Sequence, residues 1–253
     1  MNIVVFDTET TSIDKPFCYN IGYVIANSES HEILVKRDFV VEQVWHNLPL
    51  FSSAYYAEKR ELYVSAMKGK RTTLDKFGYI CRQMHRDFTV YNVEIAFAYN
   101  SPFDEKVFAF NCDWYKCMNP FDTIPIVDIR GFAHTFIVND DYKVFCEKYN
   151  LFTETGNYST TAEAVFRYVR NDVTFAEEHT ALADSEIEYE ILMNCLERGA
   201  DITKEYAVLR SINRECLQTF SVIDRKTKET LFQSDCTKIQ YDKKNNTVKL
   251  TTL

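Results

Sequence analysis

Three strand-like segments joined by short connections occupy the first 42 residues of the chain. They are Ile3 to Glu9, Tyr19 to Ala26 and Ile33 to Val41, and each is rich in β-branched or aromatic residues. The second connection contains the turn-forming run Asn27 to Ser30. Because short connections join neighbouring strands in opposite directions, the sequence predicts an antiparallel meander at the start of the fold.

Helical and strand-like segments alternate through the rest of the first 200 residues. Helical spacing of apolar residues predicts helices over Leu50 to about Lys68 and Thr73 to about Arg86, and Val93 to Tyr99 follows as a strand. A helix is expected over Phe103 to about Trp114 and a strand over about Thr123 to Asp128. Helical stretches follow around Arg130, Tyr142 and Ala162, and a long helix runs from about Ala181 to Arg198. This alternation predicts an α/β fold.

The pattern changes beyond Gly199 and Asp201. Four short strand-like segments follow in two pairs, each pair around a charged turn: Thr219 to Ile223 with Thr230 to Gln233, and Lys238 to Tyr241 with Thr247 to Leu250. We therefore expect two domains, 1–200 and a β-rich appendage over 201–253. Basic residues in its turns, Arg225, Lys226, Lys228, Lys243 and Lys244, suggest two alternatives, contacts to substrate phosphates or solvated turns.

Composition excludes several classes of protein. The chain has 29 Lys plus Arg against 37 Asp plus Glu, a formal charge of −8, which argues against a nucleic-acid-coating protein but not against an enzyme that holds cations in acids. No apolar run approaches the roughly 20 residues that span a bilayer, and the first residues lack a secretory pattern. The 8 Cys form no Cys-x-x-Cys pair, so we expect reduced core thiols and a cytoplasmic location.

Two carboxylates, Asp7 and Glu9, end the first predicted strand. The period of two places them on the same face as Ile3 and Val5. Like charges at this spacing repel unless a cation or a proton lies between them, so the pair fits oxygen ligation of a hard cation. A solvated strand end is the alternative in a chain this acidic.

Asp104 follows a predicted strand end and the turn Asn100 to Pro102. It leads the row Val107, Phe108 and Asn111, whose spacing aims the acid along the buried face of a helix and toward the sheet. The alternative is an acid at a helix start, where the helix dipole favours it.

His179 and Asp184 flank the start of the last long helix. At about 100° per residue, positions five apart diverge by roughly 140°, so the two side chains cannot face the same way from one regular helix. We therefore expect His179 on the preceding loop, from which it can turn back toward a site that Asp184 faces. A surface histidine is the alternative.

Together these three segments resemble the exonuclease motifs of the DEDDh family, the proofreading-type (DnaQ-like) nucleases of the ribonuclease H-like fold. The family pattern is Asp-x-Glu, Asn-x-x-Phe-Asp and His-x-x-x-x-Asp, and it is matched here by Asp7 to Glu9, Asn100 to Asp104 and His179 to Asp184. The resemblance covers about residues 1–198. It implies a mixed sheet flanked by helices, and the chain departs from it at Ser12, where Gly is frequent, and at Tyr99, where His is common.

The resemblance also implies an activity, 3′-to-5′ exonucleolytic release of nucleoside 5′-monophosphates by two-metal-ion hydrolysis. Two Mg²⁺ or Mn²⁺ ions would be held by four acids, with Asp7 bridging both, Glu9 and Asp184 on the nucleophile side and Asp104 on the second ion. His179 would be the general base. Four further residues would contact the nucleic acid: Thr8, Thr10, Asn100 and Phe103.

The motif residues leave the substrate open. We expect the 3′ end of single-stranded DNA, and an exoribonuclease that trims RNA ends or short oligoribonucleotides is the first alternative. The second is a non-catalytic module that binds nucleic acid or a polymerase.

Overall fold

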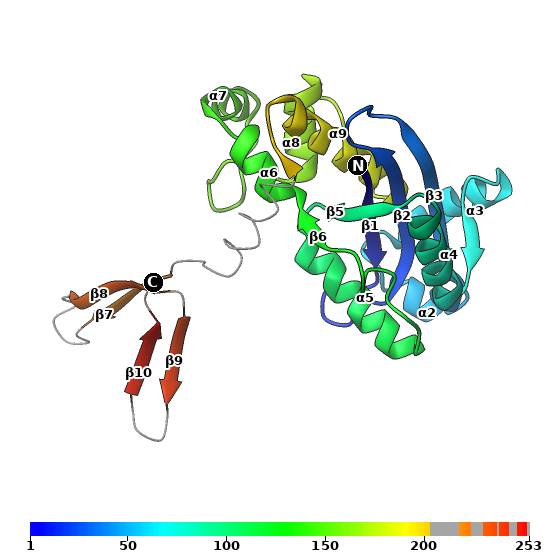
Figure 1. Ribbon diagram of the computed structural model, residues 1–253, viewed down its shortest axis with the longest axis horizontal. Coiled ribbons are helices and arrows are strands. Elements are labelled where there is room, and N and C mark those ends of the chain that lie inside the picture. Colours follow the sequence, from blue (N-terminus) through cyan, green and yellow to red (C-terminus); the bar gives the residue numbers. More distant parts are fainter. Residues whose placement is uncertain (203–217, 224–229, 237, 243–246, 252–253) are drawn as a thin grey trace. The chain divides into compact units, whose positions relative to one another are not determined.

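The computed structural model describes residues 1–202, 218–223, 230–236, 238–242 and 247–251 (Figure 1). The chain divides into two units, Met1–Asp201 and Ile202–Leu253. Among the described helices, none is both long enough and apolar enough to cross a membrane.

A mixed sheet of six strands forms the centre of the first unit (Figure 1). Its order is β4-β3-β2-β1-β5-β6. The strands are β1 (Asn2–Thr10), β2 (Cys18–Asn27), β3 (Ile33–Val41), β4 (Thr73–Asp75), β5 (Val93–Ala98) and β6 (Ile126–Asp128). The first three pair antiparallel, which confirms the predicted meander, whereas β5, β6 and β4 add in parallel. Only β2 runs against the other five, so the ends of β1 and β5 that carry polar residues lie at the same edge.

Helices cover both faces of this sheet, which confirms the α/β prediction. On one face, α5 (Ser101–Tyr115) packs on Phe6 through Phe108, and α4 (Phe77–Val90) packs on Tyr23 through Phe88. On the other face, α9 crosses β1 and β2 and is packed by α6 and α8. The helices of this unit beyond the β3–β4 connection are α4 (Phe77–Val90), α5 (Ser101–Tyr115), α6 (Ile129–Phe136), α7 (Asp140–Tyr149), α8 (Ala162–Arg170) and α9 (Ala181–Glu197).

The connection between β3 and β4 corrects the prediction of one helix over Leu50 to Lys68. The chain instead forms four short pieces, α1 (Glu42–Trp45), α2 (Leu48–Phe51), the 3₁₀-helix η1 (Ala57–Lys59) and α3 (Arg60–Lys68). The hydroxyl of Ser53 donates a hydrogen bond to the carbonyl of Leu50 at 2.7 Å. At the end of α2, this carbonyl is therefore bonded by a side chain.

The predicted helix start at Thr73 is also wrong. Residues Thr73–Asp75 form β4, which pairs with Phe39 to Val41 at the edge of the sheet, and the helix begins only at Phe77. Pairing with an exposed strand edge overrides the helical spacing of this segment. The strand β6 likewise begins at Ile126 rather than near Thr123.

The second unit contains two antiparallel strand pairs. They are β7 (Gln218–Ile223) with β8 (Thr230–Cys236), and β9 (Lys238–Asp242) with β10 (Thr247–Thr251). The four predicted strands of the tail are therefore confirmed. The basic turn residues Arg225, Lys226, Lys228, Lys243 and Lys244 lie outside the described residues.

Six cysteines of the described part of the chain are free thiols, and five of them are buried. The expectation of core thiols is confirmed for the five that are buried, and their redox state stays a prediction. Three thiols, Cys81, Cys112 and Cys117, lie within 4.8 Å of one another on the α4–α5 side of the sheet.

Candidate active site

Helix α9 crosses β2 so closely that only glycine fits at position 22. A Cβ atom added to Gly22 would lie 2.1 Å from the backbone nitrogen of Leu182 and 2.2 Å from the carbonyl carbon of Ala181. Gly22 is also the register partner of Asp7 on β1. The absence of a side chain at position 22 therefore lets the first turn of α9, which carries Asp184, lie directly on the sheet beside Asp7.

The buried amide of Asn20 fixes where α9 begins. Its Oδ1 accepts from the backbone nitrogen of Ala181 at 2.8 Å and from the hydroxyl of Tyr63 at 3.0 Å. Its Nδ2 donates to the carboxylate of Asp38 at 2.6 Å and to the carbonyl of Phe39 at 2.9 Å. The amide thus accepts two hydrogen bonds and donates two, which satisfies it fully. Through this one side chain, β2 is connected to β3, α3 and α9.

Four predicted acids converge from three elements. Asp7 and Glu9 come from β1, Asp104 from the first turn of α5 and Asp184 from the first turn of α9. Asp104 is only 3% exposed, and the row that it leads is buried as expected. The Oδ1 atom of Asp184 is buried and has no hydrogen-bond partner among the described residues.

Burial is the largest influence on the pKa values of these four acids. Burial raises the pKa of Asp7 well above its ordinary value, and the neighbouring carboxylate of Asp104 adds to this effect. Burial, followed by the charge of Asp184, raises the pKa of Glu9 to about 8. Burial likewise raises the pKa values of Asp104 and Asp184 to about 7 each. A cation among the four would offset both desolvation and mutual repulsion.

The donor set fits hard divalent cations. Carboxylate oxygens are the ligands that Mg²⁺ and Mn²⁺ prefer, and the unpartnered Oδ1 of Asp184 is an acceptor that a cation would satisfy. Ligand atoms of Glu9, His179 and Asp184 lie within 4.8 Å of one another. The residues present therefore fit a metal site at this edge of the sheet.

Glu188 is a further acid beside these four, and the sequence reasoning missed it. It is 4% exposed, and its Oε2 accepts from the backbone nitrogen of Tyr99 at 3.1 Å. Burial raises its pKa well above the ordinary value, and the charge of Asp104 contributes next. Its position four residues after Asp184, on the same helix face, was the available signal.

His179 lies on the loop before α9, as its spacing from Asp184 predicts. The helix begins at Ala181, and His179 has a φ of 50°, in the left-handed region. Its Nδ1 lies 3.6 Å from Oε2 of Glu177, and its ring stacks on Tyr56 with centroids 4.3 Å apart. Partial burial, and then the charge of Lys59, lower the pKa of His179, so its neutral form is favoured.

Lys59, in η1, is a second residue that the sequence reasoning missed. Its Nζ donates to the carbonyl of Glu178 and lies 4.6 Å from the ring centroid of Tyr56. Its charge opposes the rise in the pKa values of Glu9 and Asp184. No local pattern places a lysine 119 positions away beside this loop.

The four predicted nucleic-acid contacts lie near the acids in different surroundings. Thr8 is buried, and its hydroxyl donates to Oδ1 of Asp104 at 2.6 Å. The hydroxyl of Thr10 donates to the carbonyl of Ser12 at 3.3 Å. Asn100 is exposed with a φ of 65°, and Phe103 is half-buried. Thr8 therefore orients an acid, and contact of any of the four with nucleic acid stays a prediction.

Comparison with known proteins supplies the fold family. No protein-family model matches the sequence, and no curated protein matches it. The structure is similar to the nuclease domain of 3′hExo, a DEDDh family member, bound to rAMP. The sequence identity is 12%, the TM-score is 0.51, and the similarity covers 78% of this chain and 92% of the other. It is also similar to a 3′-exonuclease in a structure of 3′-end specific recognition of a histone mRNA stem-loop. Here the identity is 13%, the TM-score is 0.52, and the similarity covers 78% of this chain and 82% of the other.

A third similar structure is E. coli exonuclease I bound to single-stranded DNA, in a zinc-ion-bound form. The identity is 14%, the TM-score is 0.51, and the similarity covers 82% of this chain and 43% of the other. These similarities confirm that the chain has the DEDDh-type exonuclease fold, a ribonuclease H-like arrangement of a mixed sheet and flanking helices.

Proposed function

We propose that this chain is a divalent-metal-dependent 3′-to-5′ exonuclease that releases nucleoside 5′-monophosphates from single-stranded DNA. One observation carries the proposal, the convergence of Asp7, Glu9, Asp104 and Asp184 at one edge of the sheet with raised pKa values. The fold shared with DEDDh exonucleases supports it. A purely structural role does not account for a cluster of acids whose pKa values are all raised by burial.

The four acids would hold two Mg²⁺ or Mn²⁺ ions. Bound there, the ions would supply charge stabilisation to the scissile phosphate and acidify the attacking water. Thr8 donates to Asp104 and so fixes the orientation of that carboxylate. Glu188 anchors the backbone at Tyr99, directly before the turn that leads to Asp104. Thr8 thus holds Asp104 directly, and Glu188 supports the backbone before the turn that carries Asp104.

His179 would accept the proton of the attacking water at its free ring nitrogen. Its lowered pKa keeps the imidazole neutral at physiological pH, as a general base requires. The Nδ1 atom faces Glu177 at 3.6 Å, which leaves Nε2 for the reaction. The flat contact with Tyr56 holds the ring on its loop.

The test is digestion of 5′-labelled single-stranded and duplex oligonucleotides with Mg²⁺, Mn²⁺ or a chelator. We expect products that shorten from the 3′ end, mononucleotides with a 5′ phosphate and no reaction with chelator. Asp184→Asn should remove the activity, and Asp141→Asn, at an exposed position of α7, should keep it. Binding without cleavage under every metal condition would instead support a non-catalytic module.

An exoribonuclease is the second candidate. Two similar structures involve ribonucleotides, one bound to rAMP and one concerned with a histone mRNA stem-loop. The same digestion with RNA of identical sequence distinguishes the two. A rate at least tenfold higher on RNA than on DNA would assign the chain to RNA.

A further inference from the structure

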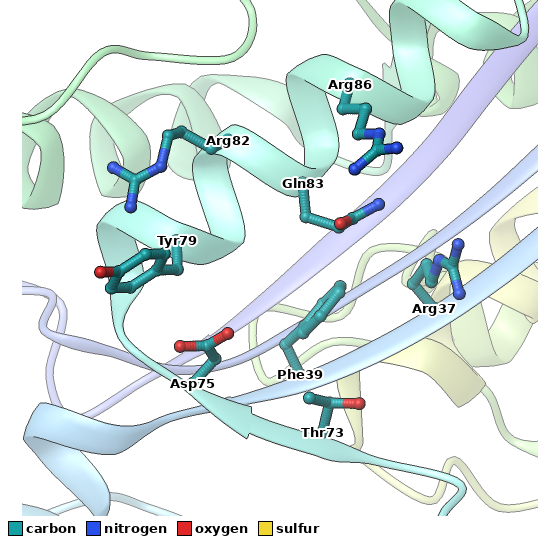
Figure 2. A pocket seen from close by; sticks show the side chains of 8 residues that line it. All are labelled: Arg37, Phe39, Thr73, Asp75, Tyr79, Arg82, Gln83 and Arg86. Carbon is teal, nitrogen blue, oxygen red and sulfur yellow. The ribbon is translucent and has the colours of Figure 1, made fainter.

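A groove rich in arginine lies between α4 and the sheet edge formed by β3 and β4 (Figure 2). Its volume is about 410 Å³. The residues that line it include Arg37, Phe39, Asp75, Tyr79, Arg82 and Arg86. None of them belongs to the carboxylate cluster, and the groove opens on the α4 side of the sheet rather than on the α9 side.

The charge of Arg37 is already used inside the protein. Its Nε donates to Oδ2 of Asp87 at 3.0 Å, and that carboxylate is only 5% exposed. Asp87 also accepts from the hydroxyl of Tyr23 at 2.8 Å and from Nε2 of Gln83 at 2.7 Å. The charges of Arg37 and the buried Asp87 beneath the groove therefore neutralise each other, and neither is left to bind a ligand.

Arg82 and Arg86 remain as exposed cations. Within the part of the chain that the structure describes, neither forms an ion pair or a hydrogen bond. They stand four positions apart on α4, an advance of about 6 Å along the helix, which is the scale of one nucleotide. The acid in the groove, Asp75, accepts from the backbone nitrogen of Lys76 at 2.7 Å. The groove is therefore locally positive in a chain of formal charge −8.

An exposed aromatic ring accompanies these cations. Tyr79 is 54% exposed, and the guanidinium of Arg82 lies 4.1 Å from its ring centroid. Figure 2 shows Tyr79, Arg82 and Arg86 along the helix and Phe39 on the strand that faces it. Guanidinium groups bind phosphates, and an exposed ring stacks on unpaired bases, so this combination is typical of surfaces that bind single strands.

We propose that the groove binds the phosphate backbone of a single-stranded nucleic acid, through Arg82 and Arg86, with a base against Tyr79. The identity of that strand as the substrate rests on the proposed function. A strand held at a distance from its 3′ end stays attached between cleavage events, because the groove contacts do not depend on the residue removed.

The test measures binding of the full chain to labelled oligonucleotides in chelator, where no cleavage occurs, over a range of salt. A 20-nucleotide strand should bind more tightly than a trinucleotide. Arg82→Ala/Arg86→Ala should weaken binding of the long strand roughly tenfold at low salt and reduce the salt slope by about 1.4, at about 0.7 per lost phosphate contact. Arg82→Lys/Arg86→Lys should keep most of the slope, because it keeps the charges. Tyr79→Leu should lower affinity and leave the slope unchanged.

The matched control is Lys143→Ala/Lys148→Ala, which removes two charges from α7. An equal loss in this control, or an unchanged slope in the arginine variant, would overturn the proposal. So would equal sensitivity for a blunt duplex, or full displacement of the strand by inorganic phosphate at matched ionic strength. Thermal unfolding of each variant confirms that the fold is kept.

The outcome separates this proposal from the catalytic one. Binding that depends on Arg82 and Arg86 in a chain that never cuts would retain the groove and reject the nuclease. Cleavage by a chain whose arginine variant binds like the wild type would reject the groove alone.

Discussion

The ring of Tyr56 lies parallel to the imidazole of His179, with planes 12° apart and centroids separated by 4.3 Å. Tyr56 directly precedes η1, so a segment far away in the sequence positions the histidine. The Nδ1 atom of His179 lies 3.6 Å from Oε2 of Glu177. The candidate base is thus held by an aromatic face and a carboxylate, although it lies on a loop.

His179→Ala should fold normally and cleave more slowly by a factor of roughly 10² to 10⁴, the usual cost of losing a general base. The lowered pKa means that wild-type activity should fall only as pH drops below about 6.5, the ordinary value for histidine. Single-turnover rates from pH 5 to 8 provide the measurement. The same rate and pH profile in the variant would show that another group takes the proton.

Asp7→Asn should abolish cleavage and stabilise the metal-free protein at pH 8. The substitution removes one member of a cluster in which burial and neighbouring charges raise each pKa. The substitution removes the repulsion between Asp7 and its neighbouring carboxylates, and it also removes a carboxylate that would bind the metal. Denaturant unfolding in chelator and the labelled-strand assay measure the two effects. A variant that is less stable than the wild type at pH 8 would contradict the electrostatic account.

Metal-free stability should fall as pH rises from about 4 to 8. The pKa of Glu9 is raised from 4.5 to about 8, and those of Asp104 and Asp184 from 3.8 to about 7. In this window the folded state keeps protons that the unfolded chain has released, so rising pH favours unfolding. Mg²⁺ or Mn²⁺ should restore stability at pH 8 and have little effect at pH 4. Melting curves with chelator or metal at several pH values test this, and a metal effect independent of pH would count against it.

Gly22→Ala should destabilise the protein by about 3 kcal/mol, the upper end of overpacking costs, because the methyl group would meet the α9 backbone. The control is Gly69→Ala, where an added Cβ would have its nearest contact at 3.4 Å. Urea unfolding of both variants gives the comparison. Equal stability of the two would mean that α9 can shift on the sheet at no cost.

Much of the site could be predicted from the sequence because it depends on local periodicity. Alternation along β1 places Asp7 and Glu9 on one face, and helical spacing aims Asp104 inward. The 140° divergence from Asp184 correctly separates His179 from the helix. These relationships hold within one element, so a single sequence reveals them.

The remainder depends on contacts between distant segments. Lys59 and Tyr56 reach the histidine loop only because the β3–β4 connection breaks into short helices, a break that helical spacing does not reveal. Thr73 has helical neighbours in sequence but pairs with Phe39 as an edge strand. Glu188 could have been found, since it follows Asp184 by one helical turn.

The hydrogen bond from Ala181 to Asn20 spans 161 positions along the chain. Contacts of such long range close a large loop and form late in folding, since their entropy cost must be met before they stabilise anything. Until α9 reaches β2, Asp184 remains apart from Asp7 and Glu9, and its charge does not yet raise the pKa of Glu9. During synthesis on the ribosome, the growing chain therefore has no complete cation site until the last helix of its first unit has emerged.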